Sequence, residues 1–415
     1  MAVAFASTER LWPWSLFAAL IAAAGLPIYI HAPKVYVEEY GVGLTALGLV
    51  LAGLRLLDVV QDPVLGWLAT RYRDFRAAWV TGAVALMALS MLALFAVPPP
   101  VAPLLWFALC LTGLFTAFSF LTIVFYAQGV ERAADMGPLG HTRLAGWRET
   151  GSLIGVSLAS VAPVALLAAT ANPFAALAVG FALIALVAWA AMRGNWQATG
   201  TEAPLSGLSA FAQVLRDPLS RRLLLLGLVN SAPVAITSTL FLFFVESRLA
   251  LPGWEGAFLL IFFLGAAASA PLWSRLGQHF GDKKVLLAGM VLSVLTFLWA
   301  ATLTEGQGVG FALICLTSGA ALGADTVLLP ALFARRLGQI GGAAAGFGLW
   351  AFVTKLSLAL AAATLLPALQ QAGFTPGPAN SADALSRLSL LYAVLPTALK
   401  LLALGLLTFT RIERA

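Results

Sequence analysis

Apolar stretches of membrane-spanning length, separated by short polar turns, follow one another along almost the whole chain. A helix needs about 20 apolar residues to cross the hydrocarbon core of a bilayer. Turn signals such as Pro98-Pro99-Pro100 and Pro376-Gly377-Pro378 separate several of the stretches. The pattern predicts an all-α integral membrane protein with twelve transmembrane helices, over residues 11–32, 44–69, 77–97, 103–130, 144–170, 172–192, 219–246, 254–277, 284–303, 308–334, 343–370 and 385–410.

Composition excludes the soluble classes of protein. Of the 415 residues, 61% are hydrophobic and 10% are charged, whereas soluble domains carry about 25% charged residues. The net charge of +6 is explained better by basic loops on one side of a membrane than by nucleic-acid binding. Cys110 and Cys315 both lie in apolar runs, so we expect no disulfide framework, no metal site and no cofactor.

Basic residues mark one side of the membrane. Of the 24 Lys and Arg residues, 18 fall in or beside the loops of one predicted side, which also holds both termini. Loops rich in Lys and Arg face the cytoplasm. We therefore expect a monomeric, multi-pass protein of the inner (plasma) membrane with both termini in the cytoplasm. The exceptions are Lys34, Arg248 and Arg387 on the other side, and Arg55, Lys355 and Lys400 within spans.

The chain reads as two halves joined by a polar linker. The longest polar connection predicts an N-terminal six-helix half (1–192), a cytoplasmic linker (193–218) and a C-terminal six-helix half (219–415). Aligning Pro63 with Pro271 places Ala270 opposite Asp62 and Ala266 opposite Asp58. Two parallel six-helix halves are the plan of major facilitator transporters. Since the second half builds the equivalent helix without the charges, the fold does not require them.

Three ionisable residues share one face of the predicted helix 44–69. Arg55, Asp58 and Asp62 are spaced i, i+3 and i+7, and each costs about 2.5–3.5 kcal/mol at a helix centre. At about 1.5 Å per residue, both carboxylates lie near the middle of the membrane. They suit Na+ or H+ as a coupling ion. The alternative is a static ion pair between Arg55 and one aspartate, although one arginine does not neutralise two carboxylates.

Other polar residues at membrane depth are candidates for the same site. Ser119 and Thr122 share a face with Tyr126 further along, either completing a cation or substrate shell or bonding back to their own helix. The lysine at 355 lies about 18 Å into its span and is a competing internal cation that would pair with Asp58 or Asp62. Asp325 in the tenth span and Lys400 in the twelfth are also deep, and for Lys400 a structural pairing is favoured.

A polar group also opens the fifth predicted span. Arg148 is a candidate to hydrogen-bond a substrate hydroxyl or carboxylate, and Trp147 is a candidate to stack on a sugar ring. The alternative for Arg148 and Glu149 is a salt bridge that gates the cytoplasmic side. Arg143, nearer the surface, is expected to be a gate or a positive-inside residue.

The pattern Arg55-x-x-Asp58-x-x-x-Asp62-Pro63-x-x-Gly66 resembles the glycoside–pentoside–hexuronide:cation symporter family of the major facilitator superfamily. The segments 143–149, 324–327 and 348–356 are also similar. The resemblance implies that Asp58, Asp62, Ser119 and Gln61 bind or select the cation, that Arg148 lies near the sugar, and that Lys355 belongs to the cation site. It further includes Trp350 within the third matching segment. The acids that hold the sugar in the family's type member are absent here: helix 11–30 has none, and Thr122 stands at the other position.

The sequence thus predicts a secondary symporter that couples Na+ or H+ to a small organic solute, a sugar or glycoside, by alternating access. A non-sugar amphiphile such as a lysolipid is the alternative cargo. A polytopic membrane enzyme is disfavoured, because the chain has no H-E-x-x-H motif and no large catalytic loop. A transporter-like sensor is the third class left open.

Overall fold

The structure is a computed structural model that describes residues 10–167, 170–196, 208–374 and 380–411, all of its regular secondary structure there being helical. One bundle, called the N-terminal bundle below, contains α1 (Trp12–Ala23), α2 (Leu26–Tyr40), α3 (Leu44–Arg71), α4 (Arg76–Phe95), α5 (Pro103–Ala134), α6 (Gly140–Leu167) and α7 (Pro173–Met192). The C-terminal bundle contains α9 (Pro218–Phe243), α10 (Glu255–Phe280), α11 (Asp282–Ala300), α12 (Gly308–Ile340), α13 (Ala343–Gln371), α14 (Ala382–Ser389) and α15 (Leu395–Phe409).

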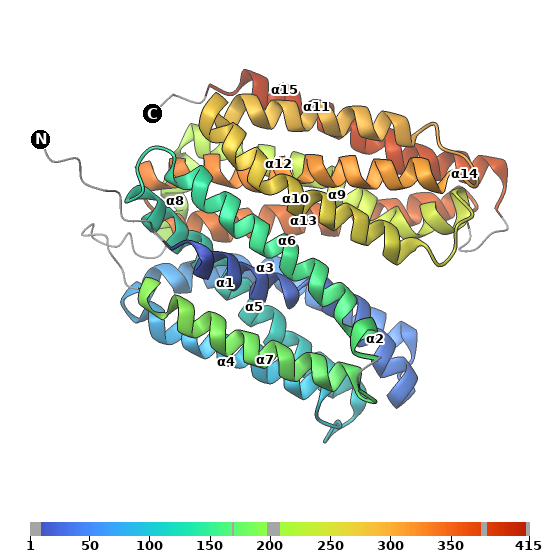
Figure 1. Cartoon of the computed structure of the whole chain (residues 1–415), viewed down its shortest axis with the longest axis horizontal. Coiled ribbons are helices and arrows are strands. Elements are labelled where there is room, and N and C mark those ends of the chain that lie inside the picture. The colour runs from blue at the N-terminus through green and yellow to red at the C-terminus, as the bar shows by residue number, and fades with distance from the viewer. Residues whose placement is uncertain (1–9, 168–169, 197–207, 375–379, 412–415) are drawn as a thin grey trace, which may run out of the picture.

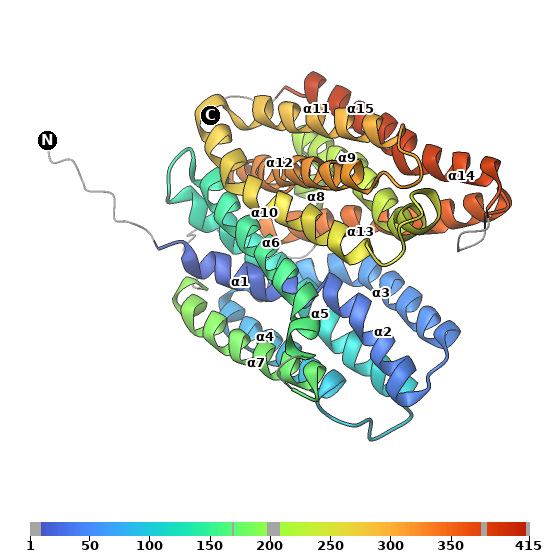
Figure 2. The same cartoon turned by 45° about the vertical axis from the view of Figure 1, so that its right-hand side comes forward.

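The two bundles lie side by side, and α1 begins and α15 ends on the same side of the molecule (Figures 1 and 2). We call this the termini face. Several pairs of helices join the bundles: α3 packs against α13, α6 packs against α10 and α12, and α5 packs against α12 and α13. Helix α6 runs obliquely along the seam, with α10 beside it in both views. These helices carry the charged residues that the sequence singles out.

The lengths of the helices fit a membrane protein. Among the described residues, nine helical segments are long and apolar enough to cross a bilayer. Helices α3 and α6, of 28 residues each, are also long enough, at about 42 Å. With the α1–α2 pair they make up the twelve predicted spans. Pro63 and Pro271, which the repeat alignment equates, lie inside α3 and α10 respectively.

The prediction of one continuous helix over residues 11–32 is wrong. The structure ends α1 at Ala23 and starts α2 at Leu26, because the backbone of Gly25 leaves the helical region with φ −88° and ψ −114°. Pro27, in the first turn of α2, has no N–H with which to continue the helix by bonding to the carbonyl of Ala23. The second helix then continues to Tyr40, where Gly41 adopts the left-handed conformation at φ 63° and ends it.

Two further features depart from the predicted elements. The predicted linker contains an amphipathic helix, α8 (Leu208–Arg216), whose Gln213 amide donates to the Ile340 carbonyl and whose Val214 is fully buried. The last predicted span is divided by a π-helical turn at Leu390–Val394, between α14 and α15. The end of the linker therefore packs against the C-terminal bundle.

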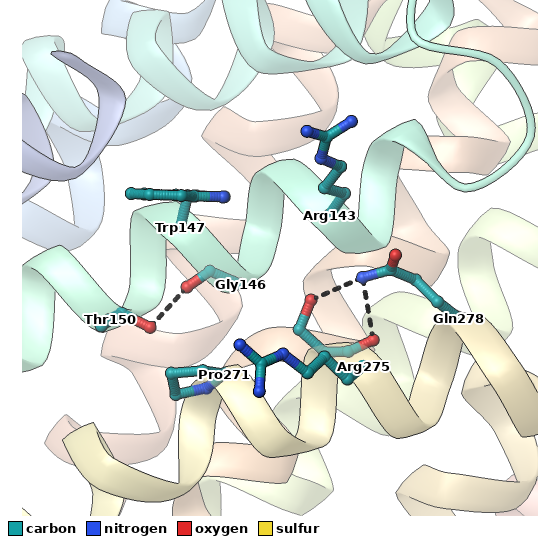
Figure 3. Close-up of a pocket in the computed structure, with 8 residues that line it drawn as sticks. Arg143, Gly146, Trp147, Thr150, Pro271, Arg275 and Gln278 are labelled. Atoms are coloured by element: carbon teal, nitrogen blue, oxygen red, sulfur yellow. Dashed lines mark hydrogen bonds between the residues drawn. The ribbon is translucent and has the colours of Figure 1, made fainter. Parts of the chain in front are cut away.

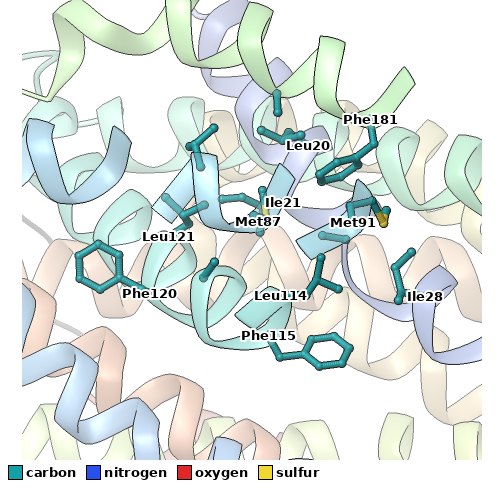
Figure 4. Packing of buried hydrophobic residues seen from close by; sticks show 14 of the residues in the cluster. Leu20, Ile21, Ile28, Met87, Met91, Leu114, Phe115, Phe120, Leu121 and Phe181 are labelled. Atoms are coloured by element: carbon teal, nitrogen blue, oxygen red, sulfur yellow. The ribbon is translucent and has the colours of Figure 1, made fainter. Parts of the chain in front are cut away.

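Apolar side chains fill the interior of each bundle and part of the contact between them. In the N-terminal bundle, Leu20, Met87, Leu114 and Leu121 are at most 1% exposed and interdigitate beneath Phe181 of α7 (Figure 4). A second cluster around Phe244 and Phe311, whose rings lie 5.6 Å apart, fills the end of the C-terminal bundle away from the termini face. A further buried cluster joins Val130 of α5 and Ala145 and Leu153 of α6 with apolar residues of the C-terminal bundle, so the contact between the bundles is partly apolar.

Candidate functional site

A lysine of the C-terminal bundle lies against two carboxylates of the N-terminal bundle. Lys355 on α13 places its Nζ 3.1 Å and 3.0 Å from the two carboxylate oxygens of Asp62, and 3.7 Å from Oδ2 of Asp58. The same ammonium donates a hydrogen bond of 2.6 Å to Oγ of Ser119 on α5. Asp62 is completely buried, and Asp58 and Ser119 are 4% and 2% exposed. These four residues are called the Lys355 cluster below.

Glycines allow α3 and α13 to approach closely enough for this contact. A Cβ atom on Gly66 would lie 3.0 Å from the carbonyl oxygen of Ala344 and 3.2 Å from Cα of Gly348. Any side chain at either glycine would push the two helices apart. Asp62 lies one turn before Gly66, and Lys355 lies two turns after Gly348, so the backbone contact fixes the charged groups at the same level.

Gln61 and Thr116 extend the cluster. The amide Nε2 of Gln61 donates to Oδ1 of Asp58 at 2.8 Å, and Thr116 Oγ1 donates to the Gln61 carbonyl oxygen at 3.0 Å. Gln61 is among the residues predicted from the sequence, whereas Thr116 is not. The signal was present, because residues 116 and 119 lie three apart on one face of the fourth span. Gln61 therefore orients the carboxylate of Asp58 through a bond that Thr116 fixes.

One sequence candidate, Thr122, does not join the cluster. Thr122 donates to the carbonyl oxygen of Phe118 at 2.7 Å, which is the self-bonding alternative for a hydroxyl in a helix. The side chain of Arg55 lies outside the described residues, although its backbone belongs to α3. The pairing of Lys355 with the aspartates, in contrast, is the one expected from the sequence.

A second polar group lies on α6 and α5, within the N-terminal bundle. Arg148 Nε donates to Oε1 of Glu149 at 2.9 Å, and the Tyr126 hydroxyl donates to the same oxygen at 2.7 Å. The Arg148 guanidinium carbon lies 3.6 Å from the centroid of the Tyr126 ring. Arg148 is 4% exposed, and its Nη2 has no hydrogen-bond partner in the described structure. The ion pair joins neighbours on one helix, so it does not bridge the two bundles as a gating salt bridge would.

A row of aromatic rings extends from this polar group to the C-terminal bundle. The Tyr126 ring lies 5.0 Å from that of Phe347, which lies 5.7 Å from Phe333. Phe333 stacks on Trp350 at 5.2 Å, and the indole lies over Gly227, where a Cβ would be 3.0 Å from it. Trp350 and Lys355 are five residues apart on α13. The predicted substrate residues Tyr126 and Trp350 therefore end one continuous row, close in sequence to the Lys355 cluster.

Trp147 lies elsewhere. Its side chain is 46% exposed and lines a surface cavity between α6 and α10 near the termini face (Figure 3). Arg148, the next residue, faces the bundle interior instead. The structure thus separates two neighbours that the sequence analysis had grouped at one substrate position.

Polar contacts close the bundles against each other at the termini face. Thr142 on α6 donates to both carboxylate oxygens of Asp282 at 2.8 Å, and Asp282 also binds Arg335 at 2.6 Å. Ser274 Oγ donates to the Thr142 carbonyl at 2.9 Å, and Gly146 leaves no room for a Cβ beside Ser274. The sequence analysis did not identify Thr142, Asp282 or Arg335, because their partners are far away along the chain.

Asp325 and Lys400 form a separate buried pair. Lys400 on α15 is 1% exposed and binds Oδ2 of Asp325 on α12 and, at 2.7 Å, the Asn230 side-chain oxygen on α9. All three residues belong to the C-terminal bundle. Asp325, named as a substrate or gating candidate, is therefore held in an ion pair within one bundle.

The donors of the Lys355 cluster are hard oxygen ligands. Two carboxylates, a hydroxyl and a nearby amide suit Na+ or a proton better than a soft metal ion. Among the described residues, no three His, Cys, Asp or Glu side chains gather in an arrangement that would hold a metal ion. The Lys355 ammonium places one positive charge among these oxygens.

Comparison with known proteins places the fold. A family model described as MFS/sugar transport protein matches residues 15–414. No curated protein matches the chain in sequence. Similar solved structures include a bacterial homologue of the iron transporter ferroportin in an outward-facing state (TM-score 0.69, 16% identity, 96% of this chain and 99% of that one). Others are the human organic anion transporter TETRAN (0.65, 17%, 96% and 98%) and the E. coli fucose:proton symporter (0.64, 16%, 95% and 99%).

Proposed function

The chain belongs to the MFS/sugar transport protein family, and from this premise we propose that it is a symporter that couples Na+ or H+ to the movement of a small organic solute. The observation that carries the proposal is the Lys355 cluster. Within it, one ammonium from one bundle occupies a site built from two carboxylates and a hydroxyl of the other bundle.

The ammonium acts as an internal substitute for the coupling ion. A Na+ ion bound between Asp58 and Asp62, or a proton on one of them, supplies the same single positive charge as the ammonium and so removes the reason for Lys355 to stay there. Because Lys355 belongs to the opposite bundle, its release loosens a contact that holds the two bundles together. Ion binding thereby changes the balance between two conformations, and a solute that prefers one of them is coupled to the ion, typically by 1–3 kcal/mol.

The solute site is proposed along the aromatic row beside the cluster. Arg148 offers an unpartnered Nη2 to a hydroxyl or carboxylate oxygen of the solute, and Phe347 and Trp350 offer ring faces to an apolar surface. A sugar or glycoside has both kinds of surface. The fucose:proton symporter shows that a neighbour with this fold carries a sugar with a proton.

The closed termini face suggests the conformation. Basic loops predict that this face is cytoplasmic, and the bundles meet there through Gly66–Gly348 and Thr142–Asp282. We propose that the structure represents an outward-facing state, like that of the ferroportin homologue. In it, Lys355 occupies the ion site before the coupling ion binds.

The test measures ion binding and transport separately. First, the unfolding temperature of the purified protein is followed as Na+ is added at alkaline pH, or as the pH is lowered without Na+. We expect one of the two cations to stabilise the parent chain but not the Asp58→Asn or Asp62→Asn variants. Asp74→Asn is the matched control, since Asp74 is exposed on a surface turn. Equal stabilisation of all four proteins would overturn the ion site.

Second, proteoliposomes are tested for uptake of monosaccharides, glycosides and uronides with an imposed gradient of the cation found in the first experiment. We expect at least one solute to be concentrated by the parent chain and only equilibrated by Asp62→Asn. Accumulation by Asp62→Asn equal to that of the parent would show that the coupling lies elsewhere.

A further inference from the structure

A cavity of about 390 Å³ lies between α6 and α10 near the termini face (Figure 3). Arg143 and Trp147 of the N-terminal bundle and Arg275 and Gln278 of the C-terminal bundle line it. In Figure 3, Arg275 and Gln278 extend from α10 towards α6, while Arg143 and Trp147 rise from α6. The cavity is formed by both bundles, so it exists in this shape only while the two helices are packed together here.

The cavity carries two positive charges without a negative one. Arg143 and Arg275 are both exposed, and neither forms an ion pair with any described residue. The nearest acids along the chain are buried and already paired: Glu149 of α6 with Arg148, and Asp282 at the start of α11 with Arg335. Two guanidinium groups brought to one cavity repel each other, and an anion between them removes the repulsion. A phosphate accepts bidentate bonds from each guanidinium.

Apolar side chains lead from the cavity towards the middle of the membrane. On α6, Ile154 and Leu158 follow Trp147 at helical spacing and are 45% and 67% exposed. On α10, Leu272 and Leu264 precede Arg275 and are 54% and 50% exposed. Trp147 itself is of the type that sits at the level of lipid headgroups. The surface therefore offers arginines to a headgroup and a paired apolar track to acyl chains.

We propose that the phosphate of an anionic phospholipid binds in this cavity, bridges Arg143 and Arg275, and holds the two bundles together at the termini face. Its acyl chains lie along Ile154–Leu158 and Leu264–Leu272. The lipid thus favours the conformation that is closed at this face. The site is separate from the Lys355 cluster, and binding there does not depend on the identity of the coupling ion or the solute.

The test uses lipid quenching of Trp147 fluorescence in nanodiscs that contain the full chain. Brominated phosphatidylglycerol or brominated phosphatidylcholine is incorporated over the same series of mole fractions, and the quenching of a Trp147→Phe variant is subtracted from that of the parent. Each arginine near an anionic lipid favours it by about fivefold. We therefore expect phosphatidylglycerol to quench Trp147 at about a fifth, or less, of the mole fraction that phosphatidylcholine needs.

A phosphate that bridges both arginines predicts a different result for the double variant than attraction to each arginine separately. If one phosphate spans both guanidinium groups, Arg143→Gln and Arg275→Gln each remove most of the lipid preference, and the double variant removes little more. Arg221→Gln, a matched exposed arginine on α9, leaves the preference intact. Equal quenching by the two lipids, or independent and additive losses from the two arginines, would overturn the bridged site. Loss of the preference on adding inorganic phosphate would assign the cavity to a soluble anion and overturn the lipid.

Discussion

Replacing Lys355 with methionine is the most direct perturbation of the proposed coupling site. Methionine keeps the apolar stem and removes the ammonium, which leaves the carboxylates of Asp58 and Asp62 buried without it. At an effective dielectric constant of about 20, unit charges 3.0 Å apart attract by about 5 kcal/mol, and those 3.7 Å apart by about 4 kcal/mol. Desolvation offsets much of this attraction. Removing one partner of such a buried pair costs about 3–5 kcal/mol.

The same change should make the site bind an external cation more tightly. In the parent chain, Na+ has to displace the ammonium, whereas in Lys355→Met it enters a site that is already open and negative. We expect the apparent dissociation constant for Na+ to fall at least about tenfold, which corresponds to about 1.4 kcal/mol. At a Na+ concentration of about 100 times that constant, binding returns about 2.7 kcal/mol of the lost stability.

The assay is a Na+ titration of thermal unfolding at alkaline pH, repeated as a pH titration without Na+ in case the coupling ion is H+. Lys355→Met should unfold at a lower temperature than the parent without the ion and should recover most of the difference with it. Lys284→Gln, an exposed lysine at the start of α11, is the matched control. If Lys355→Met is as stable as the parent and responds to neither cation more strongly, the ammonium does not compete for a cation site.

Three further sets of substitutions test a helix contact beside the Lys355 cluster, the Lys400–Asp325 pair and the Arg336–Asp217 pair. Gly66→Leu should separate α3 from α13 and shift the protein towards a state open at the termini face, seen as a longer spin-label distance between the bundles. Lys400→Met should cost about 3–5 kcal/mol of unfolding free energy, and adding Asp325→Leu should restore most of it, because the pair is buried within one bundle. The hydrogen bond from Arg336 lowers the pKa of Asp217 to about 2. The ionised Asp217 therefore stabilises the fold fully above the unfolded pKa of about 4, and this stabilisation is lost as the pH falls to about 2. Asp217→Asn should reduce stability at neutral pH but not at the acid end of a series of unfolding curves recorded at different pH.

The sequence was most informative where ionisable residues interrupt an apolar run. Such residues are few, and their cost in a membrane limits the explanations. The spacing of Asp58 and Asp62 placed both on one face of α3, and the depth of Lys355 along its own span placed it at a similar level. The structure confirms that these three groups meet. Their role in binding a coupling ion stays a prediction.

Partners that lie far apart in sequence were harder to predict. Thr142 binds Asp282, 140 positions away, and Thr116 binds Gln61, 55 positions away. No local sequence pattern predicts which helix a given hydroxyl will face. The hydroxyl of Thr122 bonds to the Phe118 carbonyl, which is the alternative that the sequence left open, because both self-bonding and cross-helix bonding satisfy a hydroxyl. The break at Gly25 was missed because apolar residues continue on both sides of it, so hydrophobicity alone predicts one helix.

The chain contains its own comparison for the proposed site. Lys400 with Asp325 and Lys355 with Asp62 are both buried lysine–aspartate pairs at membrane depth. The first joins α15 to α12 within the C-terminal bundle, and movement of one bundle against the other leaves it unchanged. The second joins α13 to α3 across the two bundles and has a second carboxylate within 3.7 Å. Only the second pair gains or loses its partner when the bundles move, and only it has the excess carboxylate that a cation would need. The location of the pair, more than the burial of its charges, is the reason to assign coupling to Lys355 and structural support to Lys400.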